Sequence, residues 1–246
     1  MKKKSIKILG FTIFTILLII FILIASFFTS SYEPSSEALA SLEASSSVDV
    51  IDNDLIVFTP QNIEANTGLI IYPGAKVEPE AYAPLAKQIA EAGYQVIITP
   101  MPLNFAIFDS NAADEVISKF PNIKHWAIAG HSLGGVMAAK YASENPIIEG
   151  VILYASYPQG DELKNSNIQV TSIYGSNDGV ADLEKISASK DLLPSNTTFI
   201  EIDGGNHAQF GSYGEQKGDN TAEISMDQQI SETSTASIQL LDNISK

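Results

Sequence analysis

Three side chains of the sequence have the types and the order that nucleophilic catalysis by a serine requires. Ser132 is the central residue of the sequence GHSLG at positions 130–134, and Asp178 and His207 follow it along the chain. A serine hydroxyl is a weak nucleophile until a neighbouring base takes its proton, which histidine can do near neutral pH. A carboxylate holds the imidazole in the correct tautomer and stabilises its cation. The sequence therefore predicts Ser132 as the nucleophile, His207 as the base and Asp178 as the acid.

The residues around the serine indicate a sharp turn between a strand and a helix. An apolar run, Trp126–Ala129, precedes the turn, and a helical pattern, Leu133–Glu144, follows it. Such a G-x-S-x-G turn lifts the serine hydroxyl above the carboxyl edge of a sheet, and only glycine fits at its flanking positions. We therefore expect Gly130, His131 and Gly134 to form the turn, with His131 orienting it.

The oxyanion of an acyl-transfer intermediate needs two preorganised hydrogen-bond donors. The first expected donor is the backbone N–H of Leu133, which follows the nucleophile and begins a helix whose dipole adds to its effect. The second should come from the turn after an earlier strand, Gly68–Tyr72. In that turn Ala75 is the preferred donor and Gly74 is the second choice.

Other residues compete for the acid and base roles. Asp182 is expected in or near a helix, and Asp203 lies only four residues before His207, so Asp178 is the better acid. His125 precedes its strand and should lie at the opposite edge of the sheet. The three histidines lack the spacing of a metal motif such as H-E-x-x-H. The sequence therefore predicts no metal site, and it indicates no cofactor.

Strands and helices alternate along the chain at short spacing. The strands are mostly apolar throughout, which is typical of a parallel sheet that helices cover on both faces. Because Asp178 and His207 follow consecutive strands, we expect them at the same sheet edge as Ser132. The connection 156–168 is too short for a lid domain. The expected strands are 48–59 (a strand or hairpin), 68–72, 94–99, 126–129, 150–155, 169–174 and 198–202, and the expected helices are 79–92, 111–120, 133–144 and 225–244.

Side chains near the predicted catalytic residues are candidates for a substrate pocket. They lie in an apolar loop, after a strand, or around the predicted base. The possible lining residues are Met101, Phe105, Tyr157, Asn206 and Phe210.

Composition excludes several classes of function. The chain of 246 residues carries 29 acidic and 14 basic residues, and all of the basic residues are lysines. A net charge of −15 argues against nucleic-acid binding, which needs basic patches. Without arginine, no guanidinium fork can hold an anionic substrate. The absence of cysteine excludes disulfides, thiolate metal sites and a cysteine nucleophile.

The N-terminal region has the pattern of a membrane anchor. Residues 1–7 are basic, 8–28 form an uncharged apolar run about one hydrocarbon thickness long, and 29–47 are rich in Ser, Ala and Glu. The lysines predict a cytoplasmic N-terminus, a single-pass transmembrane helix over 8–28 and an extracytoplasmic domain over 48–246, joined by a tether over 29–47. The alternative is secretion after cleavage of a signal peptide.

Four segments carry a resemblance to a known family: YPGAKVEPEAY at 72–82, GHSLGG at 130–135, YGSNDG at 174–179 and GNHAQFGSYG at 205–214. Together they resemble the α/β-hydrolase superfamily, and in particular its small, often membrane-anchored bacterial members near the dienelactone hydrolases (the α/β-hydrolase fold-5 group). The resemblance implies the α/β-hydrolase fold, the serine triad and the oxyanion turn. Dienelactone hydrolases use a cysteine nucleophile and an arginine for the substrate carboxylate, and this chain has neither. Haloalkane dehalogenases have Asp where this chain has Ser132.

The function that these residues predict is hydrolysis of a small-molecule carboxylic ester on the outer face of the membrane. Acyl transfer and amide cleavage are alternatives, because both use the same triad. A non-catalytic surface binding module on the same fold, or an interaction protein that works through its acidic face, is a further alternative. The sequence leaves the substrate and the oligomeric state open.

Overall fold

The computed structural model describes residues 13–22, 26–28 and 30–246, and the chain divides into two compact units, one up to Ser31 and one from Tyr32 onward. The first unit contains helical residues at 13–22 and 26–28. The remaining residues of the expected anchor, 8–12 and 23–25, lie outside the described part. Among the residues that are described, no helix combines the length and the apolar character needed to cross a membrane.

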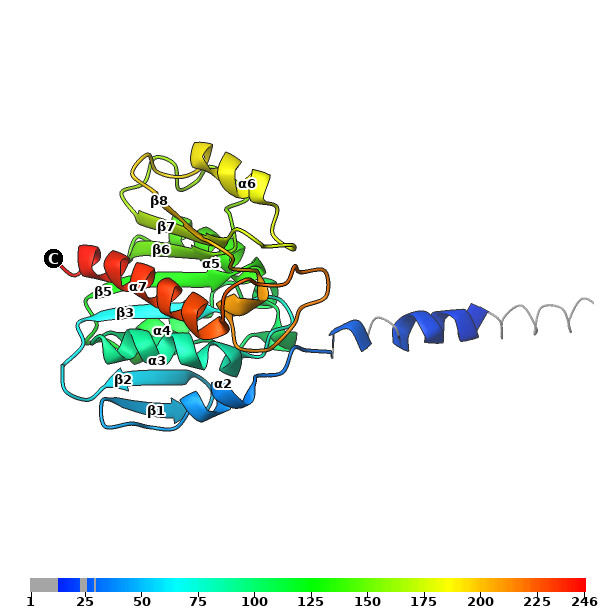
Figure 1. Ribbon diagram of the computed structural model, residues 1–246, viewed down its shortest axis with the longest axis horizontal. Coiled ribbons are helices and arrows are strands. Elements are labelled where there is room, and N and C mark those ends of the chain that lie inside the picture. The colour runs from blue at the N-terminus through cyan, green and yellow to red at the C-terminus, as the bar shows by residue number, and fades with distance from the viewer. Residues whose placement is uncertain (1–12, 23–25, 29) are drawn as a thin grey trace, which may run out of the picture. The chain divides into compact units, whose positions relative to one another are not determined.

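The second unit is built on one sheet of eight strands in the order β1-β2-β4-β3-β5-β6-β7-β8 (Figure 1). Strands β3 to β8 pair in parallel, whereas β1 and β2 form an antiparallel hairpin whose second strand pairs with β4. The expected mostly parallel sheet is therefore confirmed. The strands are β1 Val48–Asp52, β2 Ile56–Pro60, β3 Thr67–Tyr72, β4 Gln95–Ile98, β5 His125–His131, β6 Ile148–Tyr154, β7 Gln169–Gly175 and β8 Thr198–Ile202.

Helices cover both faces of this sheet, as the apolar strands predict. Strand β3 is buried along its whole length, with alternate side chains in two separate cores. Leu69 and Ile71 pack with α3 and α7, and Ile70 and Tyr72 pack with α4 and α5. The helices are α2 Ser36–Ser41, α3 Ala83–Glu91, α4 Ala113–Lys119, α5 Leu133–Glu144, α6 Leu183–Ala188 and α7 Met226–Ile244, with short 3-10 helices at Pro79–Tyr82, Pro102–Asn104, Ala106–Phe108, Ser189–Asp191 and Ala208–Phe210.

The parallel strands bring the loops with the predicted catalytic residues to one edge of the sheet. The carboxyl ends of β5, β7 and β8 carry Ser132, Asp178 and His207 respectively. The connection between β6 and β7, residues 156–168, contains no helix or strand. This short connection agrees with a domain that has no lid at that point.

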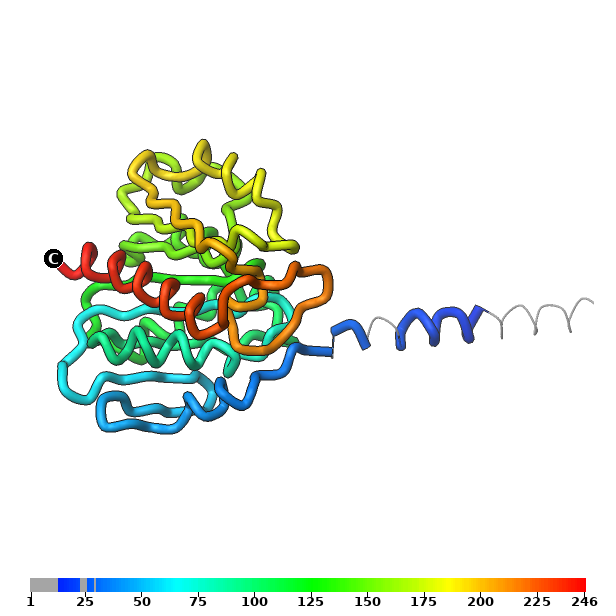
Figure 2. The backbone as a smooth tube through the Cα atoms, viewed as in Figure 1, coloured from blue at the N-terminus to red at the C-terminus, as the bar shows by residue number. Residues whose placement is uncertain are grey.

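The segment from Tyr32 to Ser47 belongs to the folded domain, which differs from the expected tether over 29–47. The Tyr32 N–H donates to the Lys76 carbonyl at 2.6 Å, and the Ser35 N–H donates to the Ser212 carbonyl at 2.8 Å. Ala38 is completely buried on α2, which packs against α3. Backbone pairing and one small buried side chain thus order a segment whose composition is typical of a linker. The tube in Figure 2 shows this blue segment on the same side of the domain as the orange loop after β8.

Candidate active site

Ser132 lies in a strained turn between β5 and α5. Its φ of 51° falls in the left-handed region, which costs a non-glycine residue about 1–3 kcal/mol. Hydrogen bonds hold this conformation, because the Ser132 N–H donates to the Tyr154 carbonyl at 2.9 Å and the Ser132 carbonyl accepts from Ser156 Oγ at 2.7 Å. The serine is partly exposed. The turn therefore presents a side chain that solvent can reach, on a backbone that its neighbours fix.

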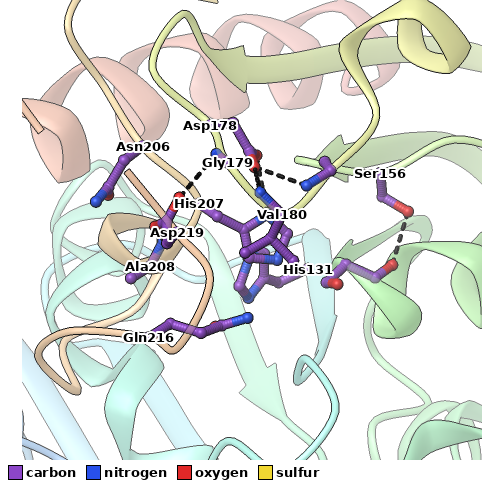
Figure 3. A network of polar contacts seen from close by, with 12 residues as sticks. His131, Ser156, Asp178, Gly179, Val180, Asn206, His207, Ala208, Gln216 and Asp219 are labelled. Atoms are coloured by element: carbon purple, nitrogen blue, oxygen red, sulfur yellow. Dashed lines mark hydrogen bonds and ion pairs between the residues drawn. The ribbon is translucent and has the colours of Figure 1, made fainter. Parts of the chain in front are cut away.

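Asp178 and His207 form a buried hydrogen-bonded pair. His207 Nδ1 lies 2.9 Å from Asp178 Oδ2, and neither side chain is more than 1% exposed. Asp178 Oδ1 accepts from the backbone N–H groups of Val180 and Ala181 at 2.8 and 2.7 Å. Both carboxylate oxygens are thus in use, and the imidazole is held in the tautomer with its proton on Nδ1. Figure 3 shows Asp178 directed at the ring of His207.

The other ring nitrogen of His207 is unused. Nε2 is buried and makes no hydrogen bond to any described residue, Ser132 included. Hydrogen bonds of this kind are often formed only when the substrate binds. With Nδ1 donating to Asp178, Nε2 presents a lone pair, which is the state that a general base requires.

The two expected donors after β3, Gly74 and Ala75, differ in their hydrogen bonds; we call the turn at 73–76 that contains them the oxyanion turn. The Gly74 N–H donates to the Tyr82 hydroxyl at 2.9 Å, so the second-choice donor is already engaged. The N–H groups of Ala75 and Leu133 donate to no other described residue. A Cβ atom added to Gly134 would lie 2.3 Å from the Tyr72 carbonyl oxygen, so the first turn of α5 lies directly against the turn after β3. This contact brings Leu133 and Ala75 to the same part of the site.

His131 connects the nucleophile turn with the oxyanion turn. The Tyr82 hydroxyl accepts from Gly74 and lies 2.8 Å from His131 Nδ1, so it donates its own proton to that nitrogen. The rings of His131 and His207 are 4.5 Å apart between centroids. Complete burial, and then the nearby charge of His207, lower the pKa of His131 well below its usual value of 6.5. His131 is therefore neutral at pH 7, and its contacts with Tyr82 and His207 suit a positioning residue.

The depressed pKa of His131 predicts that acid destabilises the domain. Below pH 6.5 the unfolded chain protonates this residue and the folded chain does not, so stability is complete above pH 6.5 and falls as the pH decreases. One such proton contributes up to about 1.4 kcal/mol per pH unit. In urea unfolding at pH 7.5 and 5.5, His131→Asn should lose less stability between the two values than the wild type. His125→Gln, at the opposite edge, is the control, and equal losses for His131→Asn and the wild type would contradict this assignment.

Asp219 joins two loops, a role that the sequence did not predict. One is the loop after β7 that contains Asp178 (the acid loop), and the other is the loop after β8 that contains His207 (the base loop). Its Oδ1 accepts from the Gly179 N–H at 2.9 Å and its Oδ2 accepts from the Ala208 N–H at 2.8 Å. These two residues follow Asp178 and His207 directly. Figure 3 shows Asp219 between the two loops. No motif marks Asp219, because its partners are backbone groups distant in sequence.

Asp219→Ala should therefore lower kcat about tenfold to a hundredfold with little change in KM, because the loops lose the hydrogen bonds that align Asp178 with His207. Steady-state kinetics on a soluble ester would measure the effect. Asp203→Ala is the matched control, since that exposed side chain precedes the same base loop. A similar loss of kcat in both variants, or a change in KM alone, would contradict the positioning role.

The expected pocket residues divide into buried and partly exposed groups. Phe210 is fully buried and stacks on Tyr154, and Met101 packs in the core with α4 and α5, so both support the fold and do not line an open wall. Asn206 borders a cavity of about 330 Å³ and Tyr157 borders one of about 660 Å³. Phe105 is partly exposed. Apolar character alone therefore does not distinguish residues of a pocket wall from core residues such as Phe210 and Met101.

Comparison with known proteins agrees with this architecture. Residues 68–231 match a family model described as "Alpha/beta hydrolase family". The fold is similar to that of a predicted CIB-like hydrolase from Thermoplasma acidophilum (TM-score 0.56, 17% identity, 80% of this chain and 97% of that one). It is also similar to Est1E from Butyrivibrio proteoclasticus (TM-score 0.57, 15% identity, 80% of this chain and 100% of that one). A comparison with curated proteins found no match. The family model spans two thirds of the chain, from β3 to α7, and shows that the chain belongs to the alpha/beta hydrolase family.

Proposed function

We propose that this protein is a serine hydrolase of carboxylic esters. The observation that carries the proposal is the buried Asp178–His207 pair at 2.9 Å, at the same sheet edge as the strained Ser132 turn. Nε2 of His207 makes no hydrogen bond within the described part of the chain. The backbone N–H groups of Leu133 and Ala75, which donate to none of the residues that the structure describes, add the donors that an oxyanion needs. Nucleophile, base, acid and oxyanion donors together support acyl transfer through a covalent intermediate.

In this reaction Ser132 Oγ attacks the ester carbonyl carbon while His207 Nε2 takes the hydroxyl proton. The resulting oxyanion accepts hydrogen bonds from Leu133 and Ala75. When the intermediate collapses, the C–O bond to the alcohol breaks and His207 returns the proton to the leaving oxygen. Water then attacks the acyl-enzyme with His207 again as base, and the acid and free Ser132 are released. Asp178 stabilises the imidazolium in both halves of the reaction.

A fluorophosphonate probe tests the nucleophile. We expect it to label the wild-type protein on Ser132 and to leave Ser132→Ala unlabelled. Ser143→Ala is the control and should be labelled like the wild type, because the Ser143 hydroxyl donates to the Lys140 carbonyl on α5 and not to the Ser132 turn. Absence of labelling in wild-type protein with an intact circular dichroism spectrum would refute a serine nucleophile. Product analysis with an added acceptor alcohol would separate hydrolysis from acyl transfer.

We also propose that residues 8–28 anchor the protein in the membrane with the hydrolase domain outside. The support is the apolar run itself and the four lysines that precede it. The full chain should remain in the membrane pellet after alkaline carbonate extraction, and external protease should degrade the domain in intact cells. Release by carbonate, or protection from external protease, would contradict the anchor or its orientation respectively.

A further inference from the structure

The site is bordered by apolar side chains that face solvent. We define the apolar rim as Leu103, Ile107, Phe108 and Val180, which are 55%, 57%, 51% and 40% exposed. Three of them belong to residues 103–108, a stretch of six residues in the loop after β4. Single exposed apolar side chains are common on protein surfaces, but a group of them beside a functional site marks an interaction surface.

The apolar rim is attached to the catalytic loops on two sides. The Lys76 N–H, next to the proposed donor Ala75, donates to the Asn104 carbonyl at 2.7 Å. Val180 follows Asp178 by two residues, and its N–H donates to Asp178 Oδ1 at 2.8 Å. The rim thus flanks both the oxyanion turn and the acid loop at the carboxyl edge of the sheet.

The loop after β4 keeps a strained backbone. Leu103 and Asn104 have φ values of 55° and 59°, two consecutive non-glycine residues in the left-handed region. Such strain is uncommon and tends to occur at functional sites. The Asn104 N–H donates to the Met101 carbonyl at 2.9 Å, which closes the turn with the Leu103 side chain in solvent.

The folded domain also begins at this edge. Tyr32 bridges the oxyanion turn, since its N–H donates to the Lys76 carbonyl at 2.6 Å and its carbonyl accepts from the Glu78 N–H at 3.1 Å. The Tyr32 ring packs on Tyr213, in the loop after the predicted base. Figure 1 shows residues 32–35, the start of the second unit just before α2, at the side of the domain where the orange loop lies. The apolar run 8–28 ends only four residues before Tyr32, and four residues span at most about 14 Å.

We propose that the carboxyl edge of the sheet rests on a lipid bilayer, with the apolar rim in the interface, and that the substrate is a long-chain ester that resides in that membrane. This inference rests on the proposed serine hydrolase and on the anchor. A short connection on the active-site edge holds Ser132 at the bilayer surface, where an amphiphilic ester reaches it without crossing water. Outside residues 1–7 the chain carries a net charge of about −19, so the surface that it fits is zwitterionic, not anionic.

The experiment compares two esters with the full chain reconstituted in phosphatidylcholine vesicles. One ester, p-nitrophenyl palmitate, is embedded in the vesicles, and the other, p-nitrophenyl acetate, is soluble. The variant is Leu103→Ser/Ile107→Ser/Phe108→Ser. We expect it to hydrolyse the embedded ester about tenfold more slowly than the wild type and the soluble ester within about twofold of it, because loss of apolar area weakens interfacial contact only.

The control is Ile63→Ser/Ile147→Ser, at two exposed apolar positions. These residues precede β3 and β6 and therefore lie toward the opposite edge of the sheet. It should hydrolyse both esters like the wild type. Equal rates on the embedded ester for the rim variant and this control would overturn the inference. If Ser132→Ala does not lower the hydrolysis of either ester, the proposed serine hydrolase is wrong. This outcome differs from a failure of the membrane inference, in which hydrolysis depends on Ser132 but not on the apolar rim.

A second readout is independent of catalysis. Because the chain has no cysteine, Ile107→Cys and Ile147→Cys each accept one environment-sensitive fluorophore. When the protein is on vesicles, we expect the emission of the fluorophore at position 107 to shift to the blue and to be quenched by lipid-bound quenchers. The fluorophore at position 147 should show neither effect. The same emission at both positions would contradict contact of the apolar rim with the bilayer.

Discussion

Asp178→Asn is expected to lower kcat about a thousandfold to ten-thousandfold while the domain stays folded. The structure determines how the new amide must point. The Oδ1 position accepts from the N–H groups of Val180 and Ala181, so the amide oxygen has to remain there. The amide NH₂ then faces His207 Nδ1 and donates to it. The imidazole proton then moves to Nε2. A protonated Nε2 has no lone pair, so it cannot accept the proton of Ser132.

Asp182→Asn is the matched control for this experiment. Asp182 caps α6 by accepting from the N–H groups of Glu184 and Lys185, and asparagine caps helices as well as aspartate does. Its kcat should equal that of the wild type, and both variants should unfold at similar urea concentrations. An Asp178→Asn enzyme with kcat within tenfold of the wild type would show that another group orients His207.

Gly134→Ala is expected to destabilise the protein and to lower its activity about a hundredfold. In a helix, alanine is normally about 1 kcal/mol more favourable than glycine. Here the new methyl group would lie 2.3 and 2.4 Å from the carbonyl oxygens of Tyr72 and Pro73, which are backbone atoms that cannot rotate away. The first turn of α5 must therefore move off the turn after β3, which separates the two oxyanion donors.

Urea unfolding and kcat of Gly134→Ala would measure both effects, with Gly160→Ala as the matched control. A Cβ at Gly160 meets only the carboxylate end of Glu162, a flexible side chain that can move. The control should therefore unfold and react like the wild type. If Gly134→Ala gains stability, as helix propensity alone predicts, and keeps its activity, then the close contact between α5 and the oxyanion turn is not required.

The sequence predicted the parts of the fold that depend on local pattern. Helix α5 and strand β8 have the expected bounds. At α5 the reason is that an apolar run with glycines at fixed positions leaves one way to build a strand, a turn and a helix. The parallel order of the strands followed from their continuous apolar character. Asp178 and His207 meet because consecutive parallel strands end at the same edge of the sheet.

The features that escaped prediction depend on backbone groups distant in sequence. Tyr32 pairs with the turn at 74–78, and Asp219 binds the N–H groups of two loops, and neither contact changes the local residue pattern. The sequence alone leaves Gly74 and Ala75 both possible as donors, because the hydrogen bond from the Gly74 N–H to the Tyr82 hydroxyl has no local sequence signal. Phe210 resembled a pocket residue because burial in a core and exposure to a ligand select the same apolar side chains.

The central claim, that Ser132 carries the acyl group, is tested most directly by trapping the intermediate. The full chain is mixed with p-nitrophenyl acetate, quenched in acid within the first turnover and analysed by mass spectrometry. An acyl-enzyme on Ser132 predicts a burst of one p-nitrophenol per active site and one acetyl group on the peptide that contains Ser132, with neither in Ser132→Ala. Hydrolysis by the wild type with no burst and no acetylated peptide, or an equal burst from Ser132→Ala, would contradict it.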